Sequence, residues 1–252
     1  MGIQVHIRRP RLGGAAVSFL MRWYYWSMNT SDKKLAIILI GPPGSGKDTQ
    51  AELLARELKF VEIKTSKIIE DKLKSAEPND AVMNHEKELK QAGQLNTSSL
   101  VEAWAIEKID EVGKSGAGLV ANGWPRKVTE AETEMLTVEK YYSKDSIKVV
   151  YITLSEEESV KRNSKRRVCE KNGHPIPNFL EYKDTVVCPQ DGSPIIVRQD
   201  DNLDTVRHRY KVYQELTEPV LDFLNKKGYS LITINGEQPI ESVHRDILDK
   251  LW

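Results

Sequence analysis

The sequence predicts an α/β fold in which a parallel five-stranded sheet lies between helices on both faces. Two observations predict it. From residue 35 onward, apolar runs of strand length alternate with segments of helical apolar spacing, which is the pattern of repeated βαβ units. The first of these runs, at residues 35–40, breaks into a glycine-rich loop that presents a lysine and then continues as a helix.

The expected strands are short apolar runs, and the expected helices occupy most of the gaps between them. Strands are expected at residues 35–40, 60–63, 118–121, 147–153 and 230–234. Helices are expected at residues 49–58, 97–112, 155–167, 203–225 and 240–251. Ser155 and Glu158 form a capping box at one helix start, and Gly228 lies just past a helix end. Residues 168–197 break the pattern with several Pro, Gly and Asn residues, which predicts a small insertion.

The loop after the first strand has the spacing of a phosphate-binding loop. GPPGSGKDTQ at residues 41–50 fits the pattern GxxxxGK, with Asp48 where Ser or Thr is expected and Thr49 one place later. Its three glycines are expected at positive φ, which lets backbone N–H groups surround phosphate oxygens. Lys47 adds a charge at a helix N-terminus, which itself favours anions. The predicted phosphate-binding residues are Gly41, Gly44, Ser45, Gly46, Lys47, Asp48 and Thr49.

Charge and cysteine content bound the class of protein. The chain has 252 residues with 37 Lys plus Arg and 37 Asp plus Glu, so its formal net charge is zero. A balanced charge gives no overall field, and neither nucleic acid nor a membrane is expected as a partner. Cys169 and Cys188 are too few for a disulfide framework, which is typical of a reducing compartment. A cytoplasmic location is therefore expected, and the chain is also expected to be a monomer.

Residues 1–34 have the character of an N-terminal extension. Arg8, Arg9 and Arg11 precede a short apolar stretch, but Arg22 interrupts it and aromatic residues follow. This stretch is too short for a membrane span and poorly formed as a signal peptide. We expect an unstructured tail or a misassigned start, with a weak signal or anchor as the alternative.

Several fragments follow the glycine loop in the order known from one enzyme family. GPPGSGKDTQ is similar to GxPGSGKGTQ, KTSKIIE at 64–70 to STGDxxR, AGQLNTSSLV at 92–101 to AGxLVxDELV, and NGWPR at 122–126 to DGFPR. These are motifs of the adenylate kinase family, and the resemblance covers nearly all of residues 35–252. It implies a three-layer α/β/α phosphate-loop (P-loop) kinase, with a monophosphate-binding insertion at about 64–94 and a lid insertion at about 168–197.

The resemblance also implies which residues bind the two nucleotides. In KRNSKRR, Arg162 would stack on the ATP base and Arg166 would contact its phosphates, and i, i+4 spacing would put both on one helix face. Arg198 and Arg209 match lid-flanking arginines that neutralise the transferring phosphoryl group. The residues implied on the acceptor side are Thr65, Gly123, Arg126, Glu130, Arg198 and Arg209. The implied cofactors are ATP and Mg²⁺, with Thr49 as the hydroxyl at the Mg-nucleotide.

The implied chemistry is transfer of the γ-phosphoryl group of Mg-ATP to AMP. It needs no nucleophilic side chain, because the acceptor phosphate is itself the nucleophile, and catalysis consists of positioning and charge stabilisation. Guanidinium forks suit phosphate oxygens. The residues expected to form this cationic clamp are Lys47, Arg126, Arg166, Arg198 and Arg209.

Four departures from the family pattern bear directly on the chemistry of the site. Glu70 replaces an arginine that touches the monophosphate, and at ~6 to 8 Å this charge reversal is worth on the order of 2 kcal/mol against binding. Asn122 replaces the aspartate of DGFPR, which organises magnesium-bound water. Glu130 replaces a glutamine that pairs with adenine, and Asp48 replaces a glycine.

These departures leave two alternatives open. The acceptor could be another nucleoside monophosphate such as GMP, or the chain could be a catalytically degenerate ATP-binding module, as Glu70, Asn122 and Asp48 together suggest. If the alignment is off by one helical turn, Lys67 or Lys72 would supply the positive charge missing at position 70.

The lid insertion carries two partial zinc knuckles. CEKNG at 169–173 and CPQDG at 188–192 resemble the CxxC knuckles of zinc-bearing bacterial adenylate kinases, with the second thiolate changed. Cys169, His174, Cys188 and Asp191 would supply four ligands for a structural Zn²⁺. The alternative is a metal-free lid in which the knuckles are turns held by hydrogen bonds.

Overall fold

A computed structural model describes residues 34–91, 94, 96–164, 166–171, 173, 175–176, 184–197 and 202–251. Residues 35–252 belong to one compact unit. The expected extension at 1–34 lies outside the described residues except for Lys34, and so do the predicted site residues Arg198 and His174. Within the described part of the chain, no helix has the length and apolar character needed to cross a membrane.

The central sheet is parallel and has the strand order β2–β3–β1–β4–β8. Its strands are β1 (Ala36–Ile40), β2 (Val61–Lys64), β3 (Leu119–Asn122), β4 (Ile147–Thr153) and β8 (Ser230–Asn235). Every strand lies within one residue of its predicted bounds, because each is a short apolar run between turn residues. The predicted α/β fold with five parallel strands is confirmed.

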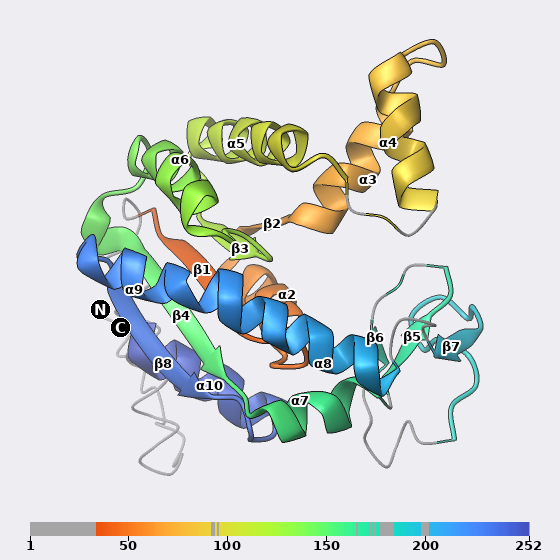
Figure 1. Ribbon diagram of the computed structural model, residues 1–252. Coiled ribbons are helices and arrows are strands. Elements are labelled where there is room, and N and C mark those ends of the chain that lie inside the picture. The colour runs from red at the N-terminus through yellow and green to blue at the C-terminus, as the bar shows by residue number, and fades with distance from the viewer. Residues whose placement is uncertain are drawn as a thin grey trace, which may run out of the picture. The chain divides into compact units, whose positions relative to one another are not determined.

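Helices cover both faces of this sheet, as Figure 1 shows. They are α2 (Lys47–Leu58), α5 (Ser98–Ser115), α6 (Val128–Glu139), α9 (Glu218–Lys226) and α10 (Ile240–Leu251). Ile38 of β1 shares one core with residues of α5, α6 and α9. Ile37 and Leu39 are buried on the opposite face, because side chains alternate along a strand, and α2 and α10 pack together on that side.

The helix α10 anchors the helix that follows the phosphate loop. Gln50, buried in α2, donates from Nε2 to the carbonyl oxygen of Ile240 at 2.9 Å. Its Oε1 lies 3.0 Å from Nδ1 of His244, whose Nε2 lies 2.8 Å from a carboxylate oxygen of Glu57. These bonds link α10 to the first and the last turn of α2.

The helix predicted at 155–167 is shorter than expected. The helix α7 spans Glu156–Asn163, and the chain then enters β5 (Arg167–Cys169), which pairs with β7 (Ile195–Val197). Arg166 therefore lies outside the helix that carries Arg162, and the prediction of a shared helix face is wrong. The basic run has helical spacing in the sequence, but the backbone from Arg167 onward forms strand hydrogen bonds with β7 instead of continuing the helix.

The capping box at the start of α7 forms only in part. The Ser155 hydroxyl accepts a hydrogen bond from the Glu158 N–H, as predicted. The Glu158 carboxylate binds Lys161 and Arg162 instead of returning to the Ser155 N–H. That N–H donates to Glu237 at 3.0 Å, so a residue distant in the sequence completes the cap.

The helix predicted at 203–225 is interrupted. It consists of α8 (Leu203–Val212), a π-helical segment (Tyr213–Thr217) and α9. Pro219 near the start of α9 has no N–H to donate, which accounts for the change in hydrogen-bond spacing just before it.

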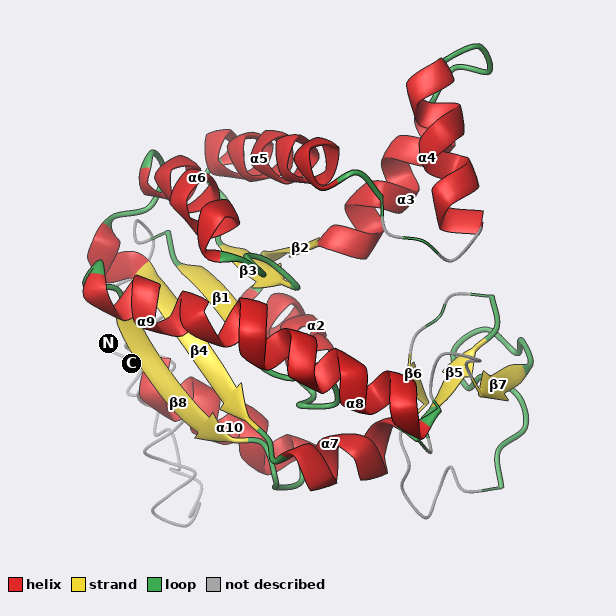
Figure 2. Ribbon diagram, in the orientation of Figure 1, coloured by secondary structure: helices red, strands yellow, loops and turns green. Residues whose placement is uncertain are grey.

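Both expected insertions contain secondary structure of their own (Figure 2). The first holds α3 (Thr65–Ser75) and α4 (Ala81–Gln91). The second holds an antiparallel sheet with the order β6–β5–β7, where β6 is Pro175–Ile176. A 3₁₀ turn at Lys144–Ser146 precedes β4. The exact bounds of the insertions stay predictions.

Candidate active site

The candidate site residues of the sheet follow the carboxyl ends of its strands, where open α/β sheets bind ligands. The loop at 41–46 follows β1, Thr65 follows β2, and Gly123 follows β3. Because β1, β2 and β3 are neighbours in the sheet, these three segments meet at one edge.

The glycine loop has the backbone that phosphate binding requires. Gly44 has a φ of 80°, and Gly46, which caps α2, has a φ of 86°. Gly41 is not at positive φ, so that part of the prediction is wrong. Position 41 requires glycine for space instead, because a Cβ there would lie 2.7 Å from the carbonyl oxygen of Ile152.

Ser45 presents an unsatisfied hydroxyl inside this loop. Its N–H donates to the carbonyl oxygen of Pro42 at 3.1 Å, which closes the turn. Its Oγ is buried and has no hydrogen-bond partner among the described residues. Buried polar atoms normally have partners, so this orphaned hydroxyl fits a loop that is completed by a bound anion.

Helix α7 supports the loop from below. The Ser159 hydroxyl donates to the carbonyl oxygen of Pro43 at 2.6 Å. Arg162 donates from Nη1 to the carbonyl oxygen of Gly44 at 3.4 Å and from Nε to Glu158 at 2.9 Å. Arg162 is thus placed beside the loop, as expected for a residue on the ATP side.

Besides Arg162, four basic side chains interact electrostatically beside the loop. Burial lowers the pKa of Lys47, Asp48 opposes that shift, and the charges of Arg126, Arg166 and Lys64 lower the pKa further. Three of these cations were predicted, namely Lys47, Arg126 and Arg166. Lys64 was not. Because these positive charges repel one another, a bound polyanion would reduce the repulsion. The cluster is therefore suited to bind a polyanion.

Two further predicted site residues, Arg209 and Thr49, lie in helices. Arg209 is half-buried in the last turn of α8, and Thr49 is partly exposed in the first turn of α2. Arg198 lies outside the described residues, so only one of the two lid-flanking arginines has a position.

The segment after β3 fixes Arg126 beside Thr65. The Thr65 hydroxyl and Nε of Arg126 both donate to the carbonyl oxygen of Gly123, at 3.2 and 2.7 Å. Trp124 is buried, donates to the carbonyl oxygen of Ile63, and precedes a cis peptide bond to Pro125. The acceptor-side residues Thr65, Gly123 and Arg126 therefore form one hydrogen-bonded group.

Glu130 also belongs to this group. One of its carboxylate oxygens accepts a hydrogen bond from the Arg126 N–H at 2.8 Å, across the first turn of α6. Glu134, one turn further along, was not identified from the sequence. Glu134 is buried, and its pKa is raised to about 9. Burial is the largest cause, and the charges of Glu130 and Glu102 add to it. The sequence held a signal for it, because Glu134 lies three residues after Ala131 and four before Val138, on the apolar face of α6.

The charge reversal at Glu70 is locally compensated. Its carboxylate pairs with Lys74 at 2.5 Å, and this hydrogen bond holds the pKa of Glu70 below its usual value. The two lysines that could have replaced the missing arginine are engaged elsewhere: Lys67 pairs with Asp71 at 2.8 Å and Lys72 with Glu107 at 2.5 Å.

Asp48 and Asn122, the other two departures, both have partners from β2. The Asp48 carboxylate lies 3.4 Å from Nζ of Lys64. Burial alone would raise the pKa of Asp48, but the charges of Lys47 and Lys64 hold this pKa below its usual value. Asn122 donates from Nδ2 to Glu62 at 2.8 Å. The sequence signal for Lys64 was present, because a lysine replaces the serine of STGDxxR.

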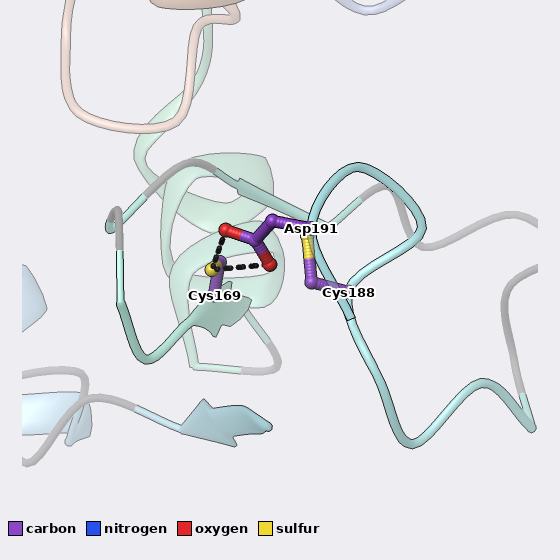
Figure 3. A group of neighbouring side chains, drawn as sticks. All are labelled: Cys169, Cys188 and Asp191. Carbon is purple, nitrogen blue, oxygen red and sulfur yellow. Dashed lines mark hydrogen bonds between the residues drawn. The ribbon is translucent and has the colours of Figure 1, made fainter. Parts of the chain in front are cut away.

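In the lid, Cys169, Cys188 and Asp191 face one another (Figure 3). The Cys169 thiol lies 3.4 and 3.6 Å from the two carboxylate oxygens of Asp191. One ligand atom from each of the three residues lies within 4.8 Å of the others, and neither cysteine forms a disulfide. The fourth predicted ligand, His174, lies outside the described residues.

A parallel sheet with a glycine loop after its central strand, and with cations beside that loop, defines the class of P-loop α/β nucleotide-binding proteins. The chain belongs to the adenylate kinase family, because the sequence model of that family, described as "Adenylate kinase", matches residues 39–229. The resemblance seen in the sequence and the expected enzyme class are confirmed.

Relatives named "Adenylate kinase" share about a third of their residues with this chain. The protein of Petrotoga mobilis is 32% identical over 219 residues, which cover 86% of this chain and 97% of the relative. That of Kosmotoga olearia is 35% identical over 218 residues, covering 85% and 98%. That of Chlamydia trachomatis serovar L2 is 32% identical over 231 residues, covering 86% and 90%.

Proposed function

We propose that this chain transfers the γ-phosphoryl group of Mg-ATP to AMP and releases two molecules of ADP. The observation that carries the proposal is the cluster of Lys47, Arg126 and Arg166 around a glycine loop in a chain of the adenylate kinase family. Relatives named "Adenylate kinase" at 32 to 35% identity favour AMP over the alternative acceptors and over a degenerate binding module.

The proposed reaction is a direct in-line transfer. An oxygen of the AMP phosphate attacks the γ-phosphorus of ATP, and the bond from that phosphorus to the β,γ-bridging oxygen breaks as the new one forms. Lys47 and Arg166 would stabilise negative charge on the donor side, and Arg126 would orient the attacking phosphate. Arg198 and Arg209 are proposed to neutralise the transferring group.

The donor half of the site fits ATP and Mg²⁺. The orphaned Ser45 hydroxyl and the positive φ of Gly44 and Gly46 suit phosphate oxygens. Thr49 would hold the metal side of the nucleotide, because hydroxyl, amide and carboxylate oxygens are the ligands Mg²⁺ prefers. When bound, Mg²⁺ neutralises charge on the β- and γ-phosphates. Asn122 keeps an oxygen but lacks the charge of the family aspartate.

The test is a panel of acceptors. Purified protein with Mg-ATP is incubated with AMP, GMP, CMP and UMP, and ADP formation is measured. We expect the highest kcat/KM with AMP. A higher value with another monophosphate would change the acceptor, and ATP binding without transfer to any of them would establish a binding module.

Glu130 is expected to weaken selectivity for AMP. A carboxylate can accept hydrogen bonds from N1–H and the amino group of guanine, whereas it cannot donate to the ring nitrogen of adenine. Glu130→Gln should therefore shift the AMP to GMP ratio of kcat/KM toward AMP by roughly tenfold, which corresponds to one hydrogen bond of about 1.4 kcal/mol. Glutamine can still accept from the Arg126 N–H, so the start of α6 should persist.

The matched control is Glu132→Gln, an exposed residue of the same helix, which should leave the ratio unchanged. An unchanged ratio in Glu130→Gln as well would show that Glu130 does not face the base.

We also propose a structural Zn²⁺ in the lid, held by Cys169, Cys188 and Asp191 with His174 as the fourth ligand. The donor set supports it, since two thiolates, a carboxylate and an imidazole suit tetrahedral zinc, and three of them already lie within 4.8 Å of one another. The small lid core, of Cys169, Ile176 and Cys188 with Ile195 against it, is too small to be stable alone, and zinc would contribute folding energy.

Protein prepared without chelators should contain about one zinc per chain by elemental analysis. Cys188→Ser should lose the metal and unfold the lid before the core, whereas Gln190→Ala, an exposed neighbour, should retain it. Zinc-free wild-type protein with both thiols accessible to a thiol reagent would leave the lid metal-free. The cytoplasmic location and the monomeric state also stay predictions.

A further inference from the structure

We propose that Lys64 binds the phosphate of the acceptor nucleotide and supplies the positive charge that position 70 lacks. The inference rests on the proposed function, because it assigns a further ligand to the acceptor side of the same site. The evidence is the place of Lys64 in the sheet, the partner of its side chain, and the engagement of the other nearby lysines.

Lys64 lies at the carboxyl end of β2, directly before two acceptor-side contacts. It is in register with Asn122 of β3, so Thr65 and Gly123 directly follow the ends of two neighbouring parallel strands. The Thr65 hydroxyl donates to the Gly123 carbonyl oxygen, which also accepts from Nε of Arg126. Lys64 is thus attached to the group of residues proposed to hold the acceptor phosphate.

The side chain of Lys64 extends toward the phosphate loop. Its Nζ lies 3.4 Å from the Asp48 carboxylate, and Asp48 directly follows Lys47. The side chains of Lys64 and Asp48 are 37% and 46% exposed, so the pair is open to solvent and to a ligand. An exposed lysine–carboxylate pair is weak, whereas a charge-assisted bond to a phosphate dianion is among the stronger contacts. Lys64 can therefore exchange Asp48 for an incoming phosphate.

Lys64 lies between residues proposed to bind the donor nucleotide and residues proposed to bind the acceptor. Lys64 acts electrostatically on Lys47 together with Arg126 and Arg166. These four cations repel one another, and the Asp48 carboxylate lies among them. A second phosphate group beside the ATP phosphates would relieve that repulsion.

No lysine of α3, the helix that follows Lys64, is equally placed. Lys67 pairs with Asp71, Lys72 with Glu107, and Lys74 with Glu70 itself. The pair of Lys74 with Glu70 removes much of the repulsion that Glu70 would exert on a phosphate but adds no phosphate ligand. Lys64 is the lysine from this region whose partner belongs to the phosphate loop.

The competing interpretation is that Lys64 only neutralises Asp48. The double variant Asp48→Gly with Lys64→Ser separates the two, because it restores both residues of the family motifs and removes both charges. If Lys64 is a phosphate ligand, the double variant loses affinity for AMP. If Lys64 only neutralises Asp48, the double variant binds AMP as the wild type does.

The experiment measures the Kd of AMP and the Kd of ATP by calorimetry in the wild type, Lys64→Gln, Lys64→Arg and the double variant. We expect the Kd of AMP to rise about tenfold in Lys64→Gln and in the double variant, and to stay within about threefold in Lys64→Arg, which keeps the charge. The Kd of ATP should stay within about twofold in the double variant. Lys67→Gln, in the helix α3 that follows Lys64, is the matched control and should bind AMP normally. Melting temperatures verify that each variant is folded.

Wild-type affinity for AMP in Lys64→Gln or in the double variant would overturn the proposal. So would an equal loss of ATP affinity in the double variant, which would place Lys64 on the donor side, and so would a wild type that binds no AMP. ADP formation by the wild type is measured separately. If AMP binding depends on Lys64 while no ADP forms, the proposed function fails and the role of Lys64 stands.

Discussion

Replacement of Lys47 by methionine is expected to lower kcat by about three orders of magnitude or more. Lys47 opens α2 directly after Gly46, and Arg126, Arg166 and Lys64 surround it. Its charge would stabilise the phosphates most strongly in the transition state, where negative charge shifts toward the leaving group. An interaction made mainly in that state affects kcat more than KM.

Methionine retains most of the length and apolar surface of the lysine stem, so the melting temperature of Lys47→Met should stay close to that of the wild type. The measurements are kcat for ADP formation and thermal unfolding followed by circular dichroism. Arg56→Met, an exposed change in the last turn of the same helix, is the control for loss of a cation from α2. A variant that retains more than a tenth of the wild-type kcat would reject the phosphate-loop mechanism.

Arg126→Ala is expected to raise the KM for AMP by about a hundredfold and to lower kcat, while the KM for ATP changes by less than about threefold. Arg126 reaches the site from the segment after β3, where its Nε donates to Gly123 and lies beside Thr65. Loss of a bidentate cation from the acceptor phosphate removes both binding energy and orientation of the attacking oxygen.

The backbone around Arg126 should survive this substitution. Its N–H is bound by Glu130 and its carbonyl oxygen by the Thr217 hydroxyl, and neither bond involves the guanidinium group. Lys127→Ala, at the adjacent position, controls for loss of positive charge at the start of α6. If the affinity for ATP collapses while the KM for AMP stays constant, the assignment of donor and acceptor sides is reversed.

The sequence by itself determined the fold, the loop and the family. Each of the five central strands is a short apolar run, and strand formation depends on local composition, so their positions could be read within one residue. The GxxxxGK motif is a short local pattern whose backbone conformation depends on adjacent residues. It therefore located Gly44, Gly46 and Lys47 correctly. The motif order placed Arg126 and Thr65 on neighbouring strand ends, where the structure also places them.

Only the tertiary structure decided which charges meet. The Asp48–Lys64 pair depends on the positions that β1 and β2 occupy in the sheet, and no local sequence pattern encodes those positions. The basic run at 161–167 has helical spacing, yet α7 ends at Asn163 because pairing between β5 and β7 competes for the backbone. The pKa of Glu134 is likewise raised by burial, and also by Glu130 and by Glu102, a residue of α5 that is near it only in the folded chain. Residues distant along the chain interact only after the sheet has formed, and the energy of those contacts then overrides local preference.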